Sequence, residues 1–254
     1  MKPTTLGVIP ARYASSRLPG KPLMDIAGKP MIQHVYERTQ KAKTLDQIVV
    51  ATDDVRIAEA VTAFGGQTMM TRSDHPSGSD RVAEVADQFD CDLVVNIQGD
   101  EPFIAPQAID TAVQKLIASP QAVVSTLVSR LYDNKSLYSR NTAKVVLSND
   151  DFALYFSRAP IPFDRDAMDE THLQPGRAHL QHIGLYVFRK SFLKKFVNLP
   201  VCDLEQLEKL EQLRVLKNGY RIVCAVVDYH SFCVDTPDDL EKARTLAKEL
   251  SVVG

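Results

Sequence analysis

The sequence lacks a marked excess of charge of either sign and contains no long apolar run. Its 254 residues include 30 Lys and Arg against 32 Asp and Glu, which leaves a formal net charge of −2. Proteins dedicated to nucleic acid usually carry a basic excess, so we expect no nucleic-acid partner. No apolar stretch approaches the roughly 18 residues that a membrane span requires, and the N-terminal stretch is not typical of a secretory signal. We therefore expect no membrane association.

Cysteine is scarce, and its spacing carries no motif. The four cysteines, Cys91, Cys202, Cys224 and Cys233, form no CxxC pair. That spacing argues against a zinc site, a redox motif or a disulfide framework. The pattern is typical of thiols in a reducing compartment, so we expect a cytoplasmic protein. Repeats and low-complexity tracts are also absent, which excludes solenoid and disordered classes.

The first half alternates short apolar runs with helical patterns. The runs 6–10, 48–52, 68–71 and 93–98 are typical of buried strands, and patterns for helices follow at 30–42, after 53–54, at 79–89 and at 106–118. Strands that alternate with helices of this length predict βαβ crossovers. The expected fold class is therefore α/β, with a Rossmann-like, mostly parallel sheet flanked by helices.

The second half has a more mixed pattern. Strands are expected at 123–131, 145–147, 152–156, 183–188 and 222–227, and helices at 204–218 and 237–250, with a polar loop over 164–181. We expect these strands to form a mixed β extension of the sheet. No composition break separates two independent domains, so 1–254 is predicted to be a single domain.

Ligands of such sheets bind beyond the carboxyl ends of the strands. The loop after the first strand, VIPARYASSRLPGKPL, contains Arg12, Arg17 and Lys21, with Gly20 permitting close approach of the backbone. Three cations in this position can neutralise phosphates, although a solvated basic loop has the same composition. The segment matches neither the GxxxxGK[ST] phosphate loop nor the GxGxxG dinucleotide motif.

Two aspartates are candidates for holding a metal. Asp100 follows the apolar run LVVNIQG, and Asp235 follows SFCV and precedes Thr-Pro. Mg²⁺ bound with a triphosphate needs only one or two protein oxygens. A turn aspartate at Asp100 and a helix lead-in at Asp235 are the alternative interpretations.

Polar side chains of the second half suit an anionic, hydroxyl-rich ligand. On a continuous helix Glu211 would lie between Leu204 and Leu207, on the apolar side, where a carboxylate needs a partner. A strand period of two places His182 and Tyr186 on one face. Each of these residues alone can be explained by a structural role. Taken together, the residues that suit such a ligand are Arg158, Arg165, His182, Tyr186, Glu211 and Gln212.

Seven motifs, in order along the chain, carry a family resemblance. They are ARYASSRLPGKPL (11–23), IVVATDD (48–54), SGSDR (77–81), VNIQGDEP (95–102), YFSR (155–158), EKLEQLR (208–214) and VDTP (234–237). With these motifs the chain resembles the sugar-nucleotide cytidylyltransferases, in particular the branch that activates the acid sugar 3-deoxy-manno-octulosonate (KDO). The resemblance implies a nucleotide-diphospho-sugar transferase fold, a nucleotide-binding half over about 1–120, and sugar-binding and dimerisation elements over about 121–230.

The resemblance also assigns roles to residues. It implies catalytic roles for Lys21, Arg12 and Asp100, and a Mg²⁺ cofactor held by Asp100 and Asp235. For the nucleotide it implies Pro10, Ala11, Arg12, Arg17, Lys21, Gly78 and Gln98, and for the sugar Arg158, Arg165, His182, Tyr186, Glu211 and Gln212. Many relatives have Thr-Glu in place of Ser79-Asp80, so Asp80 is left out, and the stretch 168–181 fits the family pattern poorly.

The expected activity is transfer of CMP from CTP to KDO, with release of pyrophosphate, for lipopolysaccharide biosynthesis. A homodimer is implied, and the apolar alternation of 123–131 offers an interface that core packing explains equally well. One alternative is the same chemistry on another acid sugar, such as an 8-amino KDO analogue or sialic acid. Another is a non-catalytic nucleotide-sugar binding protein.

Overall fold

The computed structural model describes residues 2–14, 18–166, 178–229 and 231–252, which fall into two compact units. Unit 1 contains Met1–Asp110 together with Ser231–Gly254, and unit 2 contains Thr111–His230. The boundary lies within helix α4 (Pro106–Ile117). The expectation of a single domain stays a prediction.

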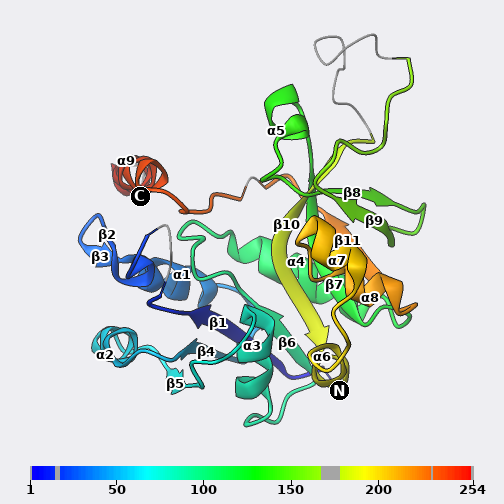
Figure 1. Ribbon diagram of the computed structural model, residues 1–254. Helices are drawn as coiled ribbons and strands as arrows, with labels where there is room; N and C mark the ends of the chain where they lie inside the picture. Colours follow the sequence, from blue (N-terminus) through cyan, green and yellow to red (C-terminus); the bar gives the residue numbers. More distant parts are fainter. Residues whose placement is uncertain (1, 15–17, 167–177, 230, 253–254) are drawn as a thin grey trace. The chain divides into compact units, whose positions relative to one another are not determined.

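The sheet of unit 1 is parallel throughout. Its strands run in the order β6 (Leu93–Asn96), β1 (Thr5–Ala11), β4 (Gln47–Thr52) and β5 (Thr68–Met70), as Figure 1 shows. The central valines and isoleucines of these strands, such as Val8, Val49 and Val94, have no exposed surface. Strands buried on both faces appear as continuous apolar runs, which is why the sequence identified them.

The helices of unit 1 begin at the residues that can cap them. Asp54 accepts a hydrogen bond from Arg56 N at the start of α2 (Val55–Ala63), and Ser77 accepts one from Asp80 N at the start of α3 (Gly78–Ala86). These side chains satisfy the first backbone donors of each helix. Helix α1 (Met31–Thr39) ends earlier than predicted, so Ala42 lies beyond it. The α/β class with a mostly parallel sheet flanked by helices is confirmed.

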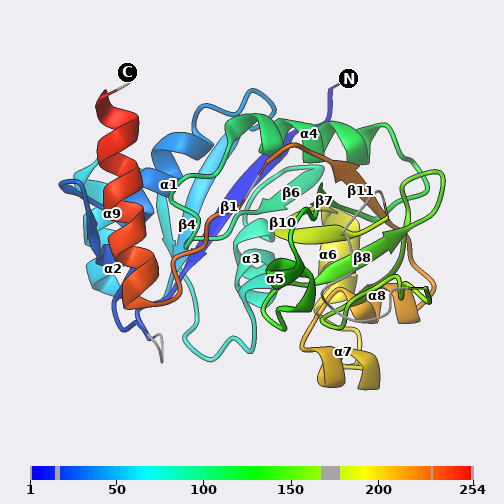
Figure 2. The same ribbon diagram turned by 90° about the horizontal axis from the view of Figure 1, so that it is seen from above.

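Short elements interrupt the loop that follows the first strand. It contains the 3₁₀ turn η1 (Lys21–Leu23), and strand β2 (Asp25–Ile26) pairs with β3 (Lys29–Pro30). These elements are too short to produce a periodic pattern. Strand β2 packs against α9 (Pro237–Val252), the long red helix of Figure 2, through a cluster that includes Ile26, Val234 and Leu240.

Unit 2 forms the mixed β extension that the sequence predicts. Strand β7 (Val124–Arg130) pairs in parallel with β11 (Ile222–Val226) and antiparallel with β10 (Leu180–Arg189). Strand β8 (Lys144–Leu147) pairs antiparallel with both β10 and β9 (Ala153–Ser157). Because β7 lies between two strands and most of it is buried, its apolar residues serve the core rather than an interface. The short helices α5 (Asn134–Tyr138) and α6 (Lys190–Phe196) were not predicted.

The helix predicted over 204–218 is wrong. The chain forms α7 (Asp203–Glu208) and α8 (Leu213–Lys217), separated at Lys209, whose φ of 54° is left-handed. Helical propensity is overridden because the Glu208 carboxylate accepts hydrogen bonds from Ser157 Oγ and Arg158 N. The argument that placed Glu211 on an apolar helix face is therefore also wrong, and Leu207 is 82% exposed.

None of the four cysteines forms a disulfide. Within the part of the chain that the structure describes, no helix combines the length and the apolarity needed to cross a membrane.

Candidate active site

The carboxyl ends of three parallel strands open onto one cavity of unit 1, with a volume of about 440 Å³. Its lining residues include Pro10 and Ala11 of β1, Arg12 after it, Asp53 after β4, and Gln98, Gly99 and Asp100 after β6, together with Lys21, Gly78 and Asp235. Every residue predicted for the nucleotide or the metal therefore lines this cavity except Arg17, which lies outside the described residues. Parallel strands meet at the same edge of a sheet, which explains why segments distant in sequence converge here.

A glycine lets two of these strand ends approach each other. A Cβ added at Gly99 would lie 2.7 Å from the carbonyl oxygen of Pro10, closer than any carbon–oxygen contact allows. At Gly78 an added Cβ would come no nearer than 3.7 Å, to the Pro10 ring. Gly99 is therefore required by the close approach of the backbone at the cavity wall, whereas Gly78 is not required sterically.

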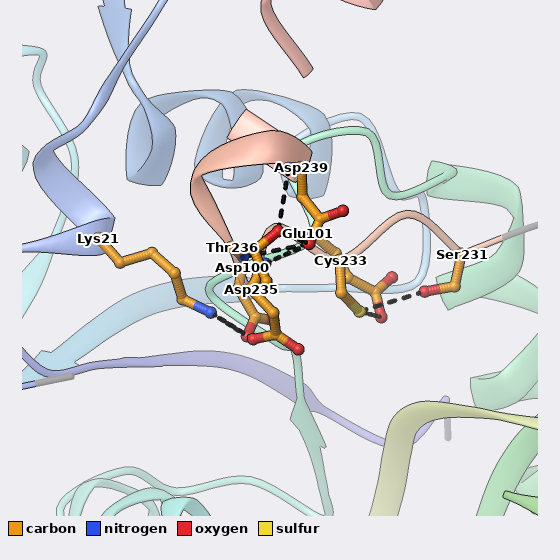
Figure 3. Close-up of polar contacts among 8 residues, drawn as sticks. All are labelled: Lys21, Asp100, Glu101, Ser231, Cys233, Asp235, Thr236 and Asp239. Atoms are coloured by element: carbon orange, nitrogen blue, oxygen red, sulfur yellow. Dashed lines mark hydrogen bonds and ion pairs between the residues drawn. The ribbon is translucent and has the colours of Figure 1, made fainter. Parts of the chain in front are cut away.

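Lys21 joins the two aspartates. Its Nζ donates to Asp100 Oδ2 at 2.7 Å and to Asp235 Oδ1 at 3.0 Å, as Figure 3 shows. The lysine side chain is 14% exposed, and Asp100 and Asp235 are 27% and 50% exposed. Burial lowers the pKa of Lys21, but the two carboxylates more than offset burial and raise this pKa above its ordinary value. Two carboxylates predicted from distant parts of the chain thus meet at a single cationic atom.

Backbone contacts hold the second carboxylate beside the first. Val234 N donates to the carbonyl oxygen of Asp100 at 3.0 Å, and the Val234 side chain is buried in the core. Beyond Asp235, the Asp239 carboxylate accepts from Thr236 N and Oγ1, while Asp239 N donates back to Thr236 Oγ1. This reciprocal cap fixes the start of α9, and Asp235 immediately precedes the capping residue Thr236.

The two aspartates suit a metal that is shared with a ligand. Among the described residues, no group of three or more His, Cys, Asp or Glu side chains is arranged to hold a metal ion. Mg²⁺ requires six oxygens and is usually held by one or two carboxylates, with phosphates and waters as the other ligands. The Lys21 ammonium already lies where a cation is stabilised by both carboxylates. The donor set therefore fits Mg²⁺ that enters with a polyphosphate.

The cavity also has a wall that sequence reasoning missed. Asp53, His75 and Arg81 line it. Arg81 Nη2 donates to Asp53 Oδ2 at 3.0 Å, and Arg81 also contacts Thr71. Asp53 and Arg81 stand in the motifs IVVATDD and SGSDR, but no role was assigned to them, and the only signal for His75 was its position within RSDHPSGSDR.

His182 and Tyr186 come together in unit 2, as predicted. Their ring centroids lie 5.3 Å apart, and His182 also packs edge-on against Phe156 at 5.2 Å. His182 Nε2 lies 2.8 Å from Thr126 Oγ1. Burial, with a smaller effect of the nearby Arg158 charge, lowers the pKa of His182 to about 3, so the ring is neutral. Burial and then the Glu211 carboxylate raise the pKa of Tyr186 well above its ordinary value.

Arg158 is held by backbone carbonyls. Its Nε donates to Glu208 O at 2.8 Å, and its Nη1 donates to Arg140 O at 2.9 Å. The carbonyl oxygen of Arg158 accepts from Lys144 Nζ at 2.6 Å, and this lysine also donates to the carbonyls of Ser139 and Thr142. Lys144 has no exposed surface, and burial followed by the Arg158 charge lowers the pKa of Lys144 to about 8.

The other residues predicted for the sugar differ in their surroundings. Gln212 is 3% exposed, and its Nε2 has no hydrogen-bond partner among the described residues. A buried amide that lacks a partner is unusual and is consistent with a ligand contact. Glu211 lies near enough to Tyr186 to influence its pKa. Arg165 is exposed in a turn.

Comparison with known proteins identifies the family. The family model for cytidylyltransferases matches residues 6–222. A 3-deoxy-manno-octulosonate cytidylyltransferase from Syntrophotalea carbinolica is 54% identical over 235 residues, which cover 92% of this chain and 94% of that relative. The protein of the same description from Geobacter sulfurreducens is 50% identical over 239 residues, covering 92% of this chain and 96% of the relative.

Solved structures agree with the sequence comparison. The structure of a CMP:2-keto-3-deoxy-manno-octonic acid synthetase complexed with CTP matches with a TM-score of 0.90 and 44% identity, covering 97% of this chain and 99% of that chain. A putative glucose-1-phosphate thymidylyltransferase from Bacillus anthracis matches at 17% identity with a TM-score of 0.66, covering 97% of this chain and 96% of that chain, and shows the shared fold alone. The chain therefore belongs to the cytidylyltransferase family, among the 3-deoxy-manno-octulosonate cytidylyltransferases.

Proposed function

We propose that this protein transfers CMP from CTP to the anomeric hydroxyl of KDO and releases pyrophosphate, for lipopolysaccharide biosynthesis. The observation that carries the proposal is the convergence of Asp100, Asp235 and Lys21 in the cavity at the strand ends of unit 1. The relatives described above carry names for this activity at about half identity over nearly the whole chain.

The cations of the cavity bind the triphosphate. Lys21 and Arg12 both line the cavity, and their charges offset the negative charge that develops on the phosphates as the α-phosphorus is attacked. Pro10, Ala11, Gly78 and Gln98 lie along the same walls and would contact the nucleoside. These side chains and backbone groups orient the nucleotide, and none of them forms a covalent bond to it.

Asp100 and Asp235 would hold Mg²⁺ together with the triphosphate. When bound there, Mg²⁺ supplies Lewis-acid polarisation of a phosphate oxygen and lowers the pKa of a hydroxyl that shares it. The two carboxylates are kept in place by the Val234–Asp100 backbone bond and by the cap at Thr236. Lys21 lines the cavity together with both carboxylates, so it can also contact the phosphates.

The acid sugar would bind to polar groups of unit 2. Arg158, Arg165 and His182 supply hydrogen-bond donors for a carboxylate and hydroxyls, and Tyr186, Glu211 and Gln212 add further polar atoms. The unpartnered Nε2 of Gln212 supports a ligand contact at this position. The neutral His182 ring binds as a dipole rather than as a cation.

The test is pyrophosphate release by the purified protein with four nucleoside triphosphates and a panel of acid sugars. We expect release with CTP, KDO and Mg²⁺, and little with ATP or GTP. Faster release with an 8-amino KDO analogue or sialic acid would identify that sugar, rather than KDO, as the substrate. CTP binding without release for any sugar would leave a nucleotide-binding protein without catalysis and would contradict the proposal.

The family resemblance also implies a homodimer in the cytoplasm. Light scattering should then give twice the mass of one chain, and a monomeric mass at micromolar concentration would contradict the dimer. The lack of disulfides among the four cysteines supports a reducing compartment.

A further inference from the structure

The two cations of the nucleotide cavity stand on either side of a backbone hydrogen bond. Gly20 N donates to the carbonyl oxygen of Tyr13 at 2.9 Å. Tyr13 directly follows Arg12 in the chain, and Gly20 directly precedes Lys21. Both cations line the cavity, so this bond ties together the backbone that carries the two positive charges. The function proposed above assigns no role to Tyr13.

The ring of Tyr13 lies against the backbone of Gly20. A Cβ added at Gly20 would come within 3.1 Å of two ring carbons, and the φ of Gly20 is 71°. Glycine adopts this conformation at little cost, and its lack of a side chain leaves room for the ring. Lys21 begins the 3₁₀ turn η1 directly after this contact, and Leu23 N closes the turn by donating to the Gly20 carbonyl at 2.9 Å. The position of the Lys21 backbone therefore depends on where the Tyr13 ring lies.

An arginine of α2 holds this ring in place. The guanidinium carbon of Arg56 lies 3.3 Å from the centre of the Tyr13 ring. The Asp54 carboxylate in turn accepts from Arg56 Nε at 2.9 Å and from Arg56 Nη2 at 2.6 Å, and Asp54 also caps α2. A guanidinium is attracted to the face of an aromatic ring, and a bidentate ion pair fixes the plane of the guanidinium. The start of α2 thereby fixes the Tyr13 ring through Arg56.

We propose that Tyr13, held by Arg56, is a positioning residue that places the Lys21 ammonium for the triphosphate. This inference rests on the proposed nucleotide site. A lysine side chain rotates about several bonds, and ordering it for a ligand costs conformational entropy. A backbone that already directs the side chain to the cavity lowers this cost and strengthens binding. The ammonium lies beside two carboxylates of the cavity, as Figure 3 shows, and Tyr13 acts through Lys21 rather than by contact with the nucleotide.

The test is a double-mutant cycle on the binding of CTP, measured by calorimetry with Mg²⁺ and without sugar. Tyr13→Leu removes the ring and should weaken CTP binding at least about tenfold, as expected when one charge-assisted contact is lost. In a protein that already carries Lys21→Met, the same change should weaken binding less than about threefold, because a residue that acts through another has no effect without it. Unchanged binding in Tyr13→Leu alone, or the full tenfold loss in the Lys21→Met background, would overturn the inference.

Conservative variants separate the ring from its hydroxyl and from the charge above it. Tyr13→Phe keeps the ring and should bind CTP within about threefold of the wild-type protein. Asp54→Asn combined with Arg56→Gln removes the cation from the ring without leaving an uncompensated carboxylate, and asparagine still caps α2. This pair of substitutions should weaken CTP binding about two- to fivefold, the effect of one exposed cation–π contact. A tenfold loss in Tyr13→Phe, or no effect of the paired substitutions, would contradict the assignment.

Cytidine distinguishes positioning from general damage to the cavity. It carries no phosphate, so its binding, measured by NMR titration, should be equal in the wild-type protein and in Tyr13→Leu. Loss of cytidine binding along with CTP binding in Tyr13→Leu would show a purely structural role and would refute the inference. Pyrophosphate release with CTP and KDO, together with unchanged CTP binding in Tyr13→Leu, would refute only the role of Tyr13. A wild-type protein that binds neither CTP nor cytidine would refute the nucleotide site itself.

Discussion

At the scale of single residues, Gly99 shows how little space separates the strand ends at the cavity. In Gly99→Ala the added methyl group would overlap the Pro10 carbonyl, at 2.7 Å in the present geometry. Relief requires movement of β1 or of the Gln98–Asp100 segment, and overpacking of this kind costs about 1 to 3 kcal/mol. We expect a lower free energy of unfolding in urea and weaker binding of CTP.

Gly78→Ala is the control for the effect of Gly99→Ala on stability. Its added methyl group would make an ordinary contact of 3.7 Å with the Pro10 ring, at the first turn of α3. Its free energy of unfolding should equal or exceed that of the wild-type protein. If Gly99→Ala is as stable as Gly78→Ala, the close approach at β1 is not a constraint.

His182 makes a second prediction at this scale, on stability in acid. Its pKa of about 3 in the folded protein lies below the ordinary value of 6.5. Between these two values the unfolded chain binds more protons, so stability is fully present above pH 6.5 and is lost as the pH falls towards 3. In His182→Gln the free energy of unfolding should fall less steeply with decreasing pH, by about 1 kcal/mol less for each pH unit.

Denaturant titrations between pH 4 and pH 7.5 give this slope. Phe156→Leu is the control, because it removes part of the packing around the His182 ring but keeps the titrating group. It should lower stability at every pH and leave the slope steep. If the free energy of unfolding of His182→Gln depends on pH as steeply as that of the wild-type protein, protonation of His182 does not destabilise the fold.

At the scale of elements, Lys144 joins the end of β9 to the turn before β8. Its ammonium donates to three carbonyls, those of Ser139, Thr142 and Arg158, and it has no exposed surface. Lys144→Met fills similar space but leaves these acceptors without a donor. Each buried acceptor without a partner costs roughly 1 to 3 kcal/mol, so we expect a loss of at least about 2 kcal/mol in the free energy of unfolding.

Lys2→Met is the comparison for this variant. Lys2 is 60% exposed and pairs with Asp46 at 3.7 Å, and exposed pairs contribute little. Urea unfolding should separate the two variants clearly. Equal stability of Lys144→Met and Lys2→Met would mean that the three carbonyls find other partners.

The elements also show what could be predicted from the sequence. Strands β1, β4 and β6 were predicted because strands buried on both faces are apolar throughout. The helix over 204–218 was wrong because a tertiary contact, between Glu208 and the end of β9, outweighs helical propensity at Lys209. Elements such as β2 and α5 were missed because a few residues contain no full period.

The residues of the candidate site were also predicted only in part. Asp100, Lys21 and Asp235 were predicted because each stands in a motif or at a strand end, and the structure brings them together. His75, Arg81 and Lys144 were missed because their importance depends on the partners that folding gives them, Glu84, Asp53 and the Ser139 carbonyl, and no motif pairs these residues. Sequence alone does not reveal which polar atoms lack a partner after folding.

At the scale of the whole molecule, the chain leaves unit 1 after Asp110 and returns to it at Ser231. The return brings Val234 into the core of unit 1 and Asp235 to the cavity. The candidate metal site therefore forms only when the last segment of the chain has folded onto the first. Loss of the α9 packing would separate the carboxylates even if the parallel sheet stayed intact.

The most direct test of the account is pyrophosphate release by Asp100→Asn and Asp235→Asn, with CTP, KDO and Mg²⁺. Each substitution keeps the shape of the side chain but removes a charge that Lys21 contacts and that would hold Mg²⁺. We predict that kcat/KM falls by about two orders of magnitude or more in both variants. Asp238→Asn, an exposed residue in the first turn of α9, should keep wild-type turnover. Near-normal turnover in either Asp100→Asn or Asp235→Asn would contradict the central claim.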